Sequence, residues 1–474
     1  MLEGTGDIAG PHVGLRSAED VVVNFRSYPK RFHMLGIFVV LGFVNQMMYL
    51  TFASIPKQIT RRYSISEGLV TAMAIECVVF YLPGSWITAR VLATTDLRRC
   101  VLVGCALQVT GTFLRFVADA IFRPVSTQLA YAMLALGQGL AAIATPTFMN
   151  TPVVFAEAWF NEHQREGVVS VLTLAPLLGQ GAGPAISGLM VTGDAGKGIE
   201  SLLALQFGLA IILVIWAAVA FRSSPPTPPS RTAGKASVEA VQGHDTMKSD
   251  SPSTLATWAS LFRRPQFLLI LSIFVSGLGA TTVLLTLFAK IIGNCGYSSA
   301  QAGLASGLFM LGGIFGALTS GAVMGTTRAY RPLLRITIAC AVVSGTIFLL
   351  CLRPGQLTRL YALATLFGMC MLSAMPVLIT NATEETFPIP SDASTSLLYV
   401  CAIIVQIPLT PLSEQILNLE NGTCGGPASP FHILFYILAG VFALLPALAY
   451  RGKYHRLEFE TARLREVSLQ PGES

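Results

Sequence analysis

Charged residues are scarce in this chain. Of its 474 residues, only 12% are charged, whereas 53% are hydrophobic. So few charged side chains cannot cover the surface of a soluble globule of this length. The composition therefore excludes an ordinary soluble enzyme or binding domain and predicts a membrane protein.

Signals for catalysis, metal binding and nucleic-acid binding are also missing. The sequence contains no HExxH or GxSxG motif and no pair of acidic residues within an apolar run. It has no ordered platform of basic and aromatic residues for nucleic acid. None of its 6 histidines stands in the middle of an apolar run, where haem ligation would place one. We therefore expect no enzymatic activity, cofactor, metal site or nucleic-acid partner.

Long apolar runs are abundant, and each has the roughly 20 residues that a helix needs to cross a bilayer core of roughly 30 Å. Twelve such runs fall into two sets of six, and we predict an all-α membrane protein with twelve transmembrane helices in two six-helix halves. The first set is 33–55, 68–92, 99–118, 127–156, 167–191 and 201–221, and the second is 266–290, 298–324, 332–353, 358–384, 393–417 and 430–450.

The polar stretches divide the chain into five parts. They are an N-terminal tail (1–32), a first bundle (33–221), a linker (222–264), a second bundle (265–450) and a C-terminal tail (451–474). The linker begins RSSPPTPPSRTAGKAS, which is too rich in Pro and Ser to build a core, so we predict disorder there. No short apolar segment precedes a small-residue cleavage site near the N-terminus, so we expect the first span to act as the insertion signal.

The distribution of basic residues predicts the orientation. If both termini are cytoplasmic, 22 of the 31 Lys and Arg residues lie on the inner side and 9 on the outer side. Lys57, Arg61 and Arg62, after the first span, oppose this bias. We expect a multi-pass protein of the plasma membrane or an internal membrane, embedded in the lipid bilayer with both termini in the cytoplasm.

The two halves carry a sequence repeat. EAWFNEHQR follows the fourth span and EETFPIPSD follows the tenth, and in each a Glu precedes a Phe by three residues. A charged residue, Arg165 or Asp392, comes five residues after that Phe. ARVLATTDLRR and GAVMGTTRAYR form a second matching pair. Two related six-span halves joined by a long linker are typical of the major facilitator superfamily of transporters.

Several motifs resemble solute carrier family 49, the feline leukaemia virus subgroup C receptor-related transporters. They are MYLTFASI, LPGSWITARVLATTDLRRCVLVG, LALGQGLAAIA, AWFNEHQREG and TEETFPIPSDASTS, and the resemblance covers about residues 33 to 450. Members of this family are credited with moving haem, choline and ethanolamine, or pyridoxine. The resemblance implies an alternating-access transporter of a small organic solute, and we expect it to be a monomer. A non-transporting receptor or scaffold with the same fold is the alternative.

The cytoplasmic loops depart from the superfamily pattern. Ala93 stands where the motif has an Asp and Asp96 where it has a Gly, while Arg98 matches. Gly325 takes the corresponding acidic position in the second half. A charge-based latch is therefore weakened, either because packing alone serves or because function differs. The residues that we predict for the gating loops are Asp96, Arg98, Glu157, Arg165, Arg328, Glu384 and Asp392.

The resemblance also suggests where substrate binds. Similar transporters hold a quaternary ammonium group between aromatic rings of spans one and seven, with glutamines from spans five and eleven, because ring faces attract such a cation. Tyr49 matches the first ring, but Thr282 at the second position has none. Gln180 and Gln406 lie near the two glutamine positions. These differences weaken a choline assignment, and Tyr49 as a core aromatic is the alternative.

Polar residues within the spans are the other candidates, because an unsatisfied polar group in hydrocarbon is costly. For most of them a helix-to-helix hydrogen bond is the alternative to substrate contact. Glu76 is the only acid deep within a span, so we expect it to face the cavity, protonated or paired, with a substrate or proton role or a structural hydrogen bond. The full candidate set is Asn45, Gln46, Tyr49, Glu76, Gln138, Asn150, Gln180, Thr282, Asn381, Tyr399 and Gln406, and Gln108, Gln206 and Thr281 are further polar residues of the spans.

Two features of the predicted exterior loops can be tested. Asn421-Gly422-Thr423 is a glycosylation sequon, which only an exterior or lumenal loop can use. Cys295 and Cys424 are the two cysteines that fall clearly in exterior loops, while the other seven lie in or near the spans. A disulfide bond between Cys295 and Cys424 is therefore predicted, with two free thiols as the alternative.

Overall fold

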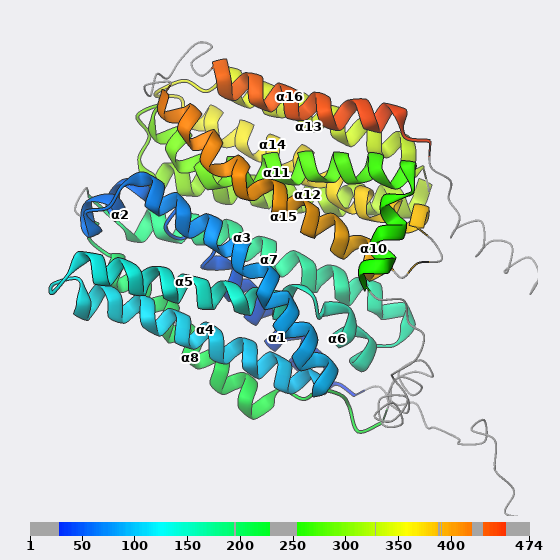
Figure 1. The fold of residues 1–474 in the computed structure, drawn as a ribbon, viewed down its shortest axis with the longest axis horizontal. Helices are drawn as coiled ribbons and strands as arrows, with labels where there is room; N and C mark the ends of the chain where they lie inside the picture. The colour runs from blue at the N-terminus through cyan, green and yellow to red at the C-terminus, as the bar shows by residue number, and fades with distance from the viewer. Residues whose placement is uncertain are drawn as a thin grey trace, which may run out of the picture.

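The structure, a computed structural model, describes residues 28–193, 196–227, 254–327, 329–386, 389, 391–419 and 430–451. These residues form helices joined by turns, with a single isolated bridge between Thr192 and Lys197. Figure 1 shows two helical bundles lying side by side. The first contains α1 (Lys30–Met47), α2 (Pro56–Tyr63), α3 (Glu67–Thr94), α4 (Leu97–Val117), η1 (Ala118–Phe122), α5 (Thr127–Met149), α6 (Pro152–Trp159), α7 (Glu162–Met190) and α8 (Ile199–Ala220). The second contains α10 (Thr254–Phe262), α11 (Pro265–Gly293), α12 (Ser299–Thr327), α13 (Tyr330–Leu350), α14 (Leu357–Thr386), α15 (Ser391–Leu419) and α16 (Pro430–Ala449).

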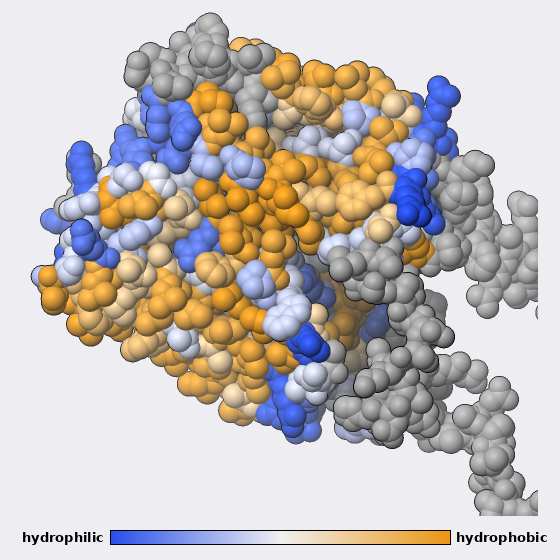
Figure 2. All heavy atoms as spheres, in the orientation of Figure 1, coloured by the Kyte–Doolittle hydropathy of each residue, from blue (hydrophilic) through white to orange (hydrophobic). Residues whose placement is uncertain are grey.

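The predicted all-α membrane fold is confirmed. Ten helices of the described chain are long and apolar enough to cross a membrane. Helix α1 with the turns that follow it, and the last helix α16, occupy the two remaining predicted spans, and α2 begins just after the first of them. The sides of the molecule are largely apolar, while hydrophilic residues gather mostly at its two ends (Figure 2). This distribution suits a protein surrounded by lipid.

Two segments differ from the sequence-based expectation. The predicted linker contains α10, because its apolar residues find a place in the second bundle: Leu261 is fully buried and Trp258 packs against the same core cluster. The first span, expected to be one helix, breaks between Met47 and Pro56. Hydroxyl groups inside the break bond to nearby carbonyls, as when Thr51 donates to Met48 O (3.0 Å). Such side-chain bonds compete with the helical pattern.

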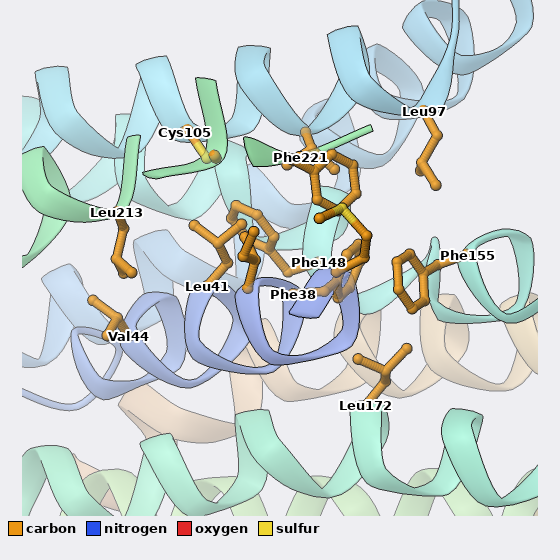
Figure 3. Packing of buried hydrophobic residues seen from close by; sticks show 14 of the residues in the cluster. Phe38, Leu41, Val44, Leu97, Cys105, Phe148, Phe155, Leu172, Leu213 and Phe221 are labelled. Carbon is orange, nitrogen blue, oxygen red and sulfur yellow. The ribbon is translucent and has the colours of Figure 1, made fainter. Parts of the chain in front are cut away.

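Each bundle has its own apolar core. In the first bundle, Phe38 of α1 packs against Phe148 and Phe155, with ring centroids 6.4 and 5.2 Å apart (Figure 3). Phe221, just after α8, lies 6.3 Å from Phe38 and closes this cluster. The second bundle has a separate core that includes Phe267 and Phe274. These two cores hold the helices of each bundle together, and another apolar cluster is shared by residues of both bundles.

The two ends of the molecule can be named from Figure 1, where α2 lies at the left and α6 and α10 lie at the right. We call these the α2 end and the α6 end. The described chain begins at Tyr28 and stops at Arg451, both at the α6 end. Alternate helices run in opposite directions between the two ends, so the described loops fall at one end or the other.

The bundles meet closely near the α2 end. A Cβ atom on Gly303 of α12 would lie 2.3 Å from the carbonyl oxygen of Pro184 on α7, and one on Gly188 of α7 would lie 2.5 Å from Ser299 O. Gln58 of α2 also donates to the Ser299 hydroxyl (2.9 Å). Toward the α6 end, the surface is hollowed between the two bundles (Figure 2). The structure is therefore closed between the bundles at the α2 end and open toward the α6 end.

Candidate substrate site between the two bundles

Tyr49 lies within the break of the first span. Gln138 of α5 holds this backbone, because its Nε2 atom donates to Tyr49 O (3.3 Å) and lies 3.5 Å from Met48 O. The same Nε2 atom lies 3.0 Å from the Cys77 sulfur of α3. On the other bundle, Gln406 of α15 lies beside the Tyr49 hydroxyl. Spans one and eleven therefore bring a ring and an amide together between the bundles.

A second polar group lies farther toward the α6 end. The Tyr81 hydroxyl of α3 donates to Asn150 Oδ1 (2.7 Å), and Asn150 Nδ2 donates to the Ser85 hydroxyl (3.3 Å). Tyr399 of α15 lies on the opposite bundle in the neighbourhood of Tyr81. Asn150 is exposed between α5 and α6, where the span bends ahead of Pro152. The open side between the bundles is thus lined by hydroxyl and amide groups.

Other predicted residues make contacts within one bundle. Asn45 is buried and its Nδ2 atom donates to Gln108 Oε1 (3.4 Å) and Ala141 O (3.3 Å). Asn381 donates to Val377 O of its own helix (2.8 Å). The Thr282 hydroxyl donates to Leu278 O (2.8 Å). Gln46 and Gln180 are half-buried. These contacts favour a packing role for Asn45, Asn381 and Thr282, while the substrate roles of all candidates stay predictions.

Glu76 takes a place that differs from the expected cavity-facing one. Its carboxylate lies against Gly139 of α5, where an added Cβ would be 2.5 Å from Oε1. Leu69 and Val79 follow the same side of α3 and are 40% and 39% exposed, so this side faces outward from the bundle. The opposite side of α3 meets the second bundle, because Glu67 there pairs with α11. Glu76 therefore lies in the α3–α5 seam at the edge of the lipid-facing surface.

The gating loop between α3 and α4 is tied to its own bundle. Asp96 caps α4 by accepting from Arg99 N (2.9 Å) and also accepts from the Ser223 hydroxyl (2.8 Å). Arg98 donates to Ala218 O of α8 (2.7 Å). Burial acts to raise the pKa of the Asp96 carboxyl, but these two hydrogen bonds and the Arg99 charge hold it below its ordinary value. This loop therefore braces α3 and α4 against α8.

The other gating residues are only partly described. Glu157 of α6 is exposed, and Glu384 near the end of α14 is buried with a partner of its own. Arg165 lies in α7 and Asp392 in α15, but their side chains are outside what the structure describes, as is the whole of Arg328. Their roles stay predictions.

The cysteines and metal ligands can be stated for the described part of the chain. Cys295 takes part in a disulfide bond, and the seven cysteines of the spans are free. Its predicted partner Cys424 and the sequon residue Asn421 lie outside the described residues. Among the residues that the structure describes, no three His, Cys, Asp or Glu side chains come together as metal ligands would.

Sequence reasoning missed an ion-pair cluster that joins the two bundles. Lys290 of α11 lies 2.6 Å from Glu67 Oε2 of α3 and 3.2 Å from Glu414 Oε1 of α15. The pair with Glu67 joins the two bundles at the α2 end. Lys290 and Glu414 lie near the ends of apolar runs, where a charged residue is usually assigned to the adjoining loop. The sequence signal that could have found these two residues was their position inside the predicted spans rather than in the loops.

Arg115 was missed as well. This α4 residue is fully buried, its Nη2 atom donates to Gln206 Oε1 (2.9 Å), and its guanidinium lies 4.6 Å from the centroid of the Phe52 ring. Gln206 in turn donates to the Thr51 hydroxyl (3.0 Å). Both contacts hold the break in the first span. An Arg inside an apolar run was the sequence signal that could have found it.

Comparisons with known proteins agree with this architecture. Curated relatives include solute carrier family 49 member A3 of Xenopus tropicalis, which is 25% identical over 85% of this chain and 82% of its own length. The choline/ethanolamine transporter FLVCR2 of Homo sapiens is 22% identical over 91% of this chain and 80% of its own. The resemblance to solute carrier family 49 is therefore confirmed.

Solved structures share the fold. A D-xylose-proton symporter superposes with a TM-score of 0.63 at 15% identity, covering 89% of this chain and 97% of its own. A bacterial homologue of the lysosomal transporter Spinster, in an inward-facing and unoccupied conformation, gives a TM-score of 0.60 at 13% identity, covering 90% and 98%. The family model of the Major Facilitator Superfamily matches residues 34–402, and this chain is therefore a membrane transporter that belongs to that superfamily.

Proposed function

We propose that this transporter carries a small organic solute by alternating access and binds it between Tyr49 and Gln406. The observation that carries this proposal is that Tyr49, in the break held by Gln138, packs against the second bundle beside Gln406. A solute held by both side chains would be coupled directly to the relative motion of the two bundles. The polar groups around Tyr81 and Asn150 lie along the open route from the α6 end. The curated names of relatives suggest solutes of the size of choline or ethanolamine.

The alternative function, a receptor or scaffold that does not transport, is less favoured. The α2 end is closed by contacts between bundles while the α6 end is open, which is one of the states that alternating access requires. Purified protein in lipid vesicles tests the proposal. Accumulation of a radiolabelled solute from a panel of small organic compounds supports transport. Specific binding without any flux would favour the receptor.

The first prediction concerns the ring in the break. Replacing Tyr49 by Ala removes a flat surface against which part of a solute packs, so apparent affinity should fall roughly tenfold. Tyr49→Phe keeps the ring and should fall much less. Solute binding and surface expression are measured for both variants. An unchanged affinity in Tyr49→Ala would assign this residue to the core instead.

We further propose that the protein works as a monomer, without nucleic acid and without enzymatic activity, in the plasma membrane or an internal membrane. The described chain begins and ends at the α6 end. The basic residues of the tails and linker favour the cytoplasm for this end. Asn421 would then be the glycosylated residue of an exterior loop at the α2 end.

The second prediction pairs Cys295 with Cys424 in that exterior space. Cys295 is disulfide-bonded and the other seven described cysteines are free, which supports Cys424 as its partner. A membrane-impermeant thiol reagent should label intact cells at these positions only after reduction. Cys295→Ser is expected to leave Cys424 reactive without reduction. A glycan on a loop of the α6 end would contradict the orientation.

A further inference from the structure

Arg115 is a buried cation with incomplete hydrogen bonding. It is 0% exposed, and its Nε and Nη1 atoms have no hydrogen-bond partner among the described residues. Only Nη2 is bonded, to the neutral amide of Gln206. Arginine keeps its charge at neutral pH. The interior of the first bundle therefore contains a positive charge that its hydrogen bonds do not neutralise.

The neighbouring acids do not pair with Arg115. Asp119, one turn away, is committed to Arg62, with oxygen-to-nitrogen distances of 2.6 and 2.7 Å, and lies 3.4 Å from Arg123. Glu76 lies in the α3–α5 seam against Gly139. No carboxylate in the described part of the chain lies within ion-pair distance of Arg115. An uncompensated buried charge is costly and exerts a strong field in a low-dielectric interior.

This charge is close to the proposed site. Gln206, which accepts a hydrogen bond from Arg115, donates one to the Thr51 hydroxyl, two residues after Tyr49. The guanidinium also stacks on Phe52, three residues after Tyr49. Arg115 thus stands behind the broken segment that presents Tyr49 to the space between the bundles.

The α2 end of the same bundle adds further positive charge. Five basic residues of the described chain lie there, including those that oppose the positive-inside bias, and Asp119 pairs with two of them, Arg62 and Arg123. The basic residues are Lys57, Arg61, Arg62, Arg123 and Lys197, and the acidic residues are Glu67, Asp119 and Glu200.

We infer that the site selects a small organic solute bearing a carboxylate or phosphate over a permanent cation, with Arg115 as the residue that determines this selectivity. The inference rests on the proposed transport site and names its substrate class. It agrees with the second bundle, where Thr282 replaces the ring that an ammonium group would need and turns its hydroxyl to its own helix. A solute near Tyr49 would meet a positive field from the first bundle.

Three solutes of similar shape test whether the electrostatic field at the site is positive. Choline, 3,3-dimethylbutan-1-ol and 3,3-dimethylbutanoate have similar size but are cationic, neutral and anionic. Binding to the purified full-length protein is measured by ligand-induced thermal stabilisation. The anion should bind more tightly than the alcohol, and choline more weakly, with about tenfold between the extremes. If the anion fails to bind at millimolar concentration, or choline binds as well as the anion, the inference is wrong.

Variants then assign the effect to Arg115. Arg115→Gln should reduce the ratio of anion to choline affinity about tenfold, and Arg115→Lys should keep most of it because the charge remains. Arg359→Gln removes an exposed cation at the α2 end of the other bundle and is the matched control, with an unchanged ratio. Glu76→Gln tests whether the seam carboxylate offsets Arg115, in which case the ratio rises. An unchanged ratio in Arg115→Gln would reject Arg115 as the determinant.

The outcomes separate this inference from the proposed function. Choline flux with tight choline binding would overturn anion selectivity and leave transport established. Anion binding without flux of any probe or other solute would support the selectivity and remove the transport proposal. If Arg115→Gln does not fold, the order of the three probes on the unmodified protein, together with the ratio in Arg115→Lys, still decides the sign of the field.

Discussion

Replacing Lys290 by Met should abolish transport and destabilise the protein. Glu414 is 5% exposed and lies 3.2 Å from Lys290 Nζ, so the variant leaves a buried carboxylate without its cation. Breaking a buried pair from one side costs about 3–5 kcal/mol. The midpoint of thermal unfolding in detergent and solute uptake into vesicles measure the two effects.

Glu67→Gln isolates the contribution of the contact between bundles. It removes the 2.6 Å pair with Lys290 but leaves Lys290 beside Glu414. Because the Glu67 side chain is 40% exposed, the pair is worth at most about 1 kcal/mol, and unfolding should change little. The same energy shifts a two-state equilibrium about fivefold, so the α2 end should open more often.

The opening can be followed at Ser54, which is 5% exposed and lines a small cavity between the bundles. A Ser54→Cys thiol should react with a membrane-impermeant maleimide several-fold faster when Glu67→Gln is also present. Arg359→Gln, an exposed residue at the same end, serves as the control and should leave the rate unchanged. Equal reaction rates in all backgrounds would show that the Lys290–Glu67 pair does not keep the bundles closed.

The spans were predictable because crossing a bilayer sets a simple length rule for apolar runs. The break in the first span was not, since MYLTFAS contains no Gly or Pro before Pro56. The break depends on Gln138 and Arg115, which lie far away in the sequence and hold its carbonyls and its Phe52 ring. The local secondary-structure propensity of a segment does not depend on such distant partners, so it could not predict the break.

The candidate site was predicted in part for a related reason. Tyr49 and Gln406 came from a resemblance that places spans one and eleven opposite each other, and the structure brings them together. Glu76 was expected in the cavity because its depth in a span is visible in the sequence. Its direction is not visible, since α3 is apolar both where it meets lipid and where it meets its neighbours. The Lys290 cluster could not be predicted from the sequence, because its residues meet only where the two bundles pack together.

Gly303→Ala should impair transport by separating the two bundles where they pack most closely. The new Cβ would lie 2.3 Å from Pro184 O and 3.0 Å from the Pro184 carbonyl carbon. Both are backbone atoms of α7, so no side chain can turn away to make room. Overpacking of this kind costs about 1–3 kcal/mol. Because α7 and α12 belong to different bundles, the cost falls mainly on the state that is closed at the α2 end.

Gly321→Ala is the matched control, because it lies on the same helix and an added Cβ would meet nothing within 4 Å. There the change removes the entropy cost of a helical glycine and should stabilise the protein by about 0.5–1 kcal/mol. Uptake into vesicles should fall at least about fivefold for Gly303→Ala, since 1 kcal/mol shifts the equilibrium by that factor, and stay near the parent level for Gly321→Ala. Similar uptake in the two variants would mean that the bundles do not need this close contact during transport, and the α7–α12 pair would then serve packing rather than motion.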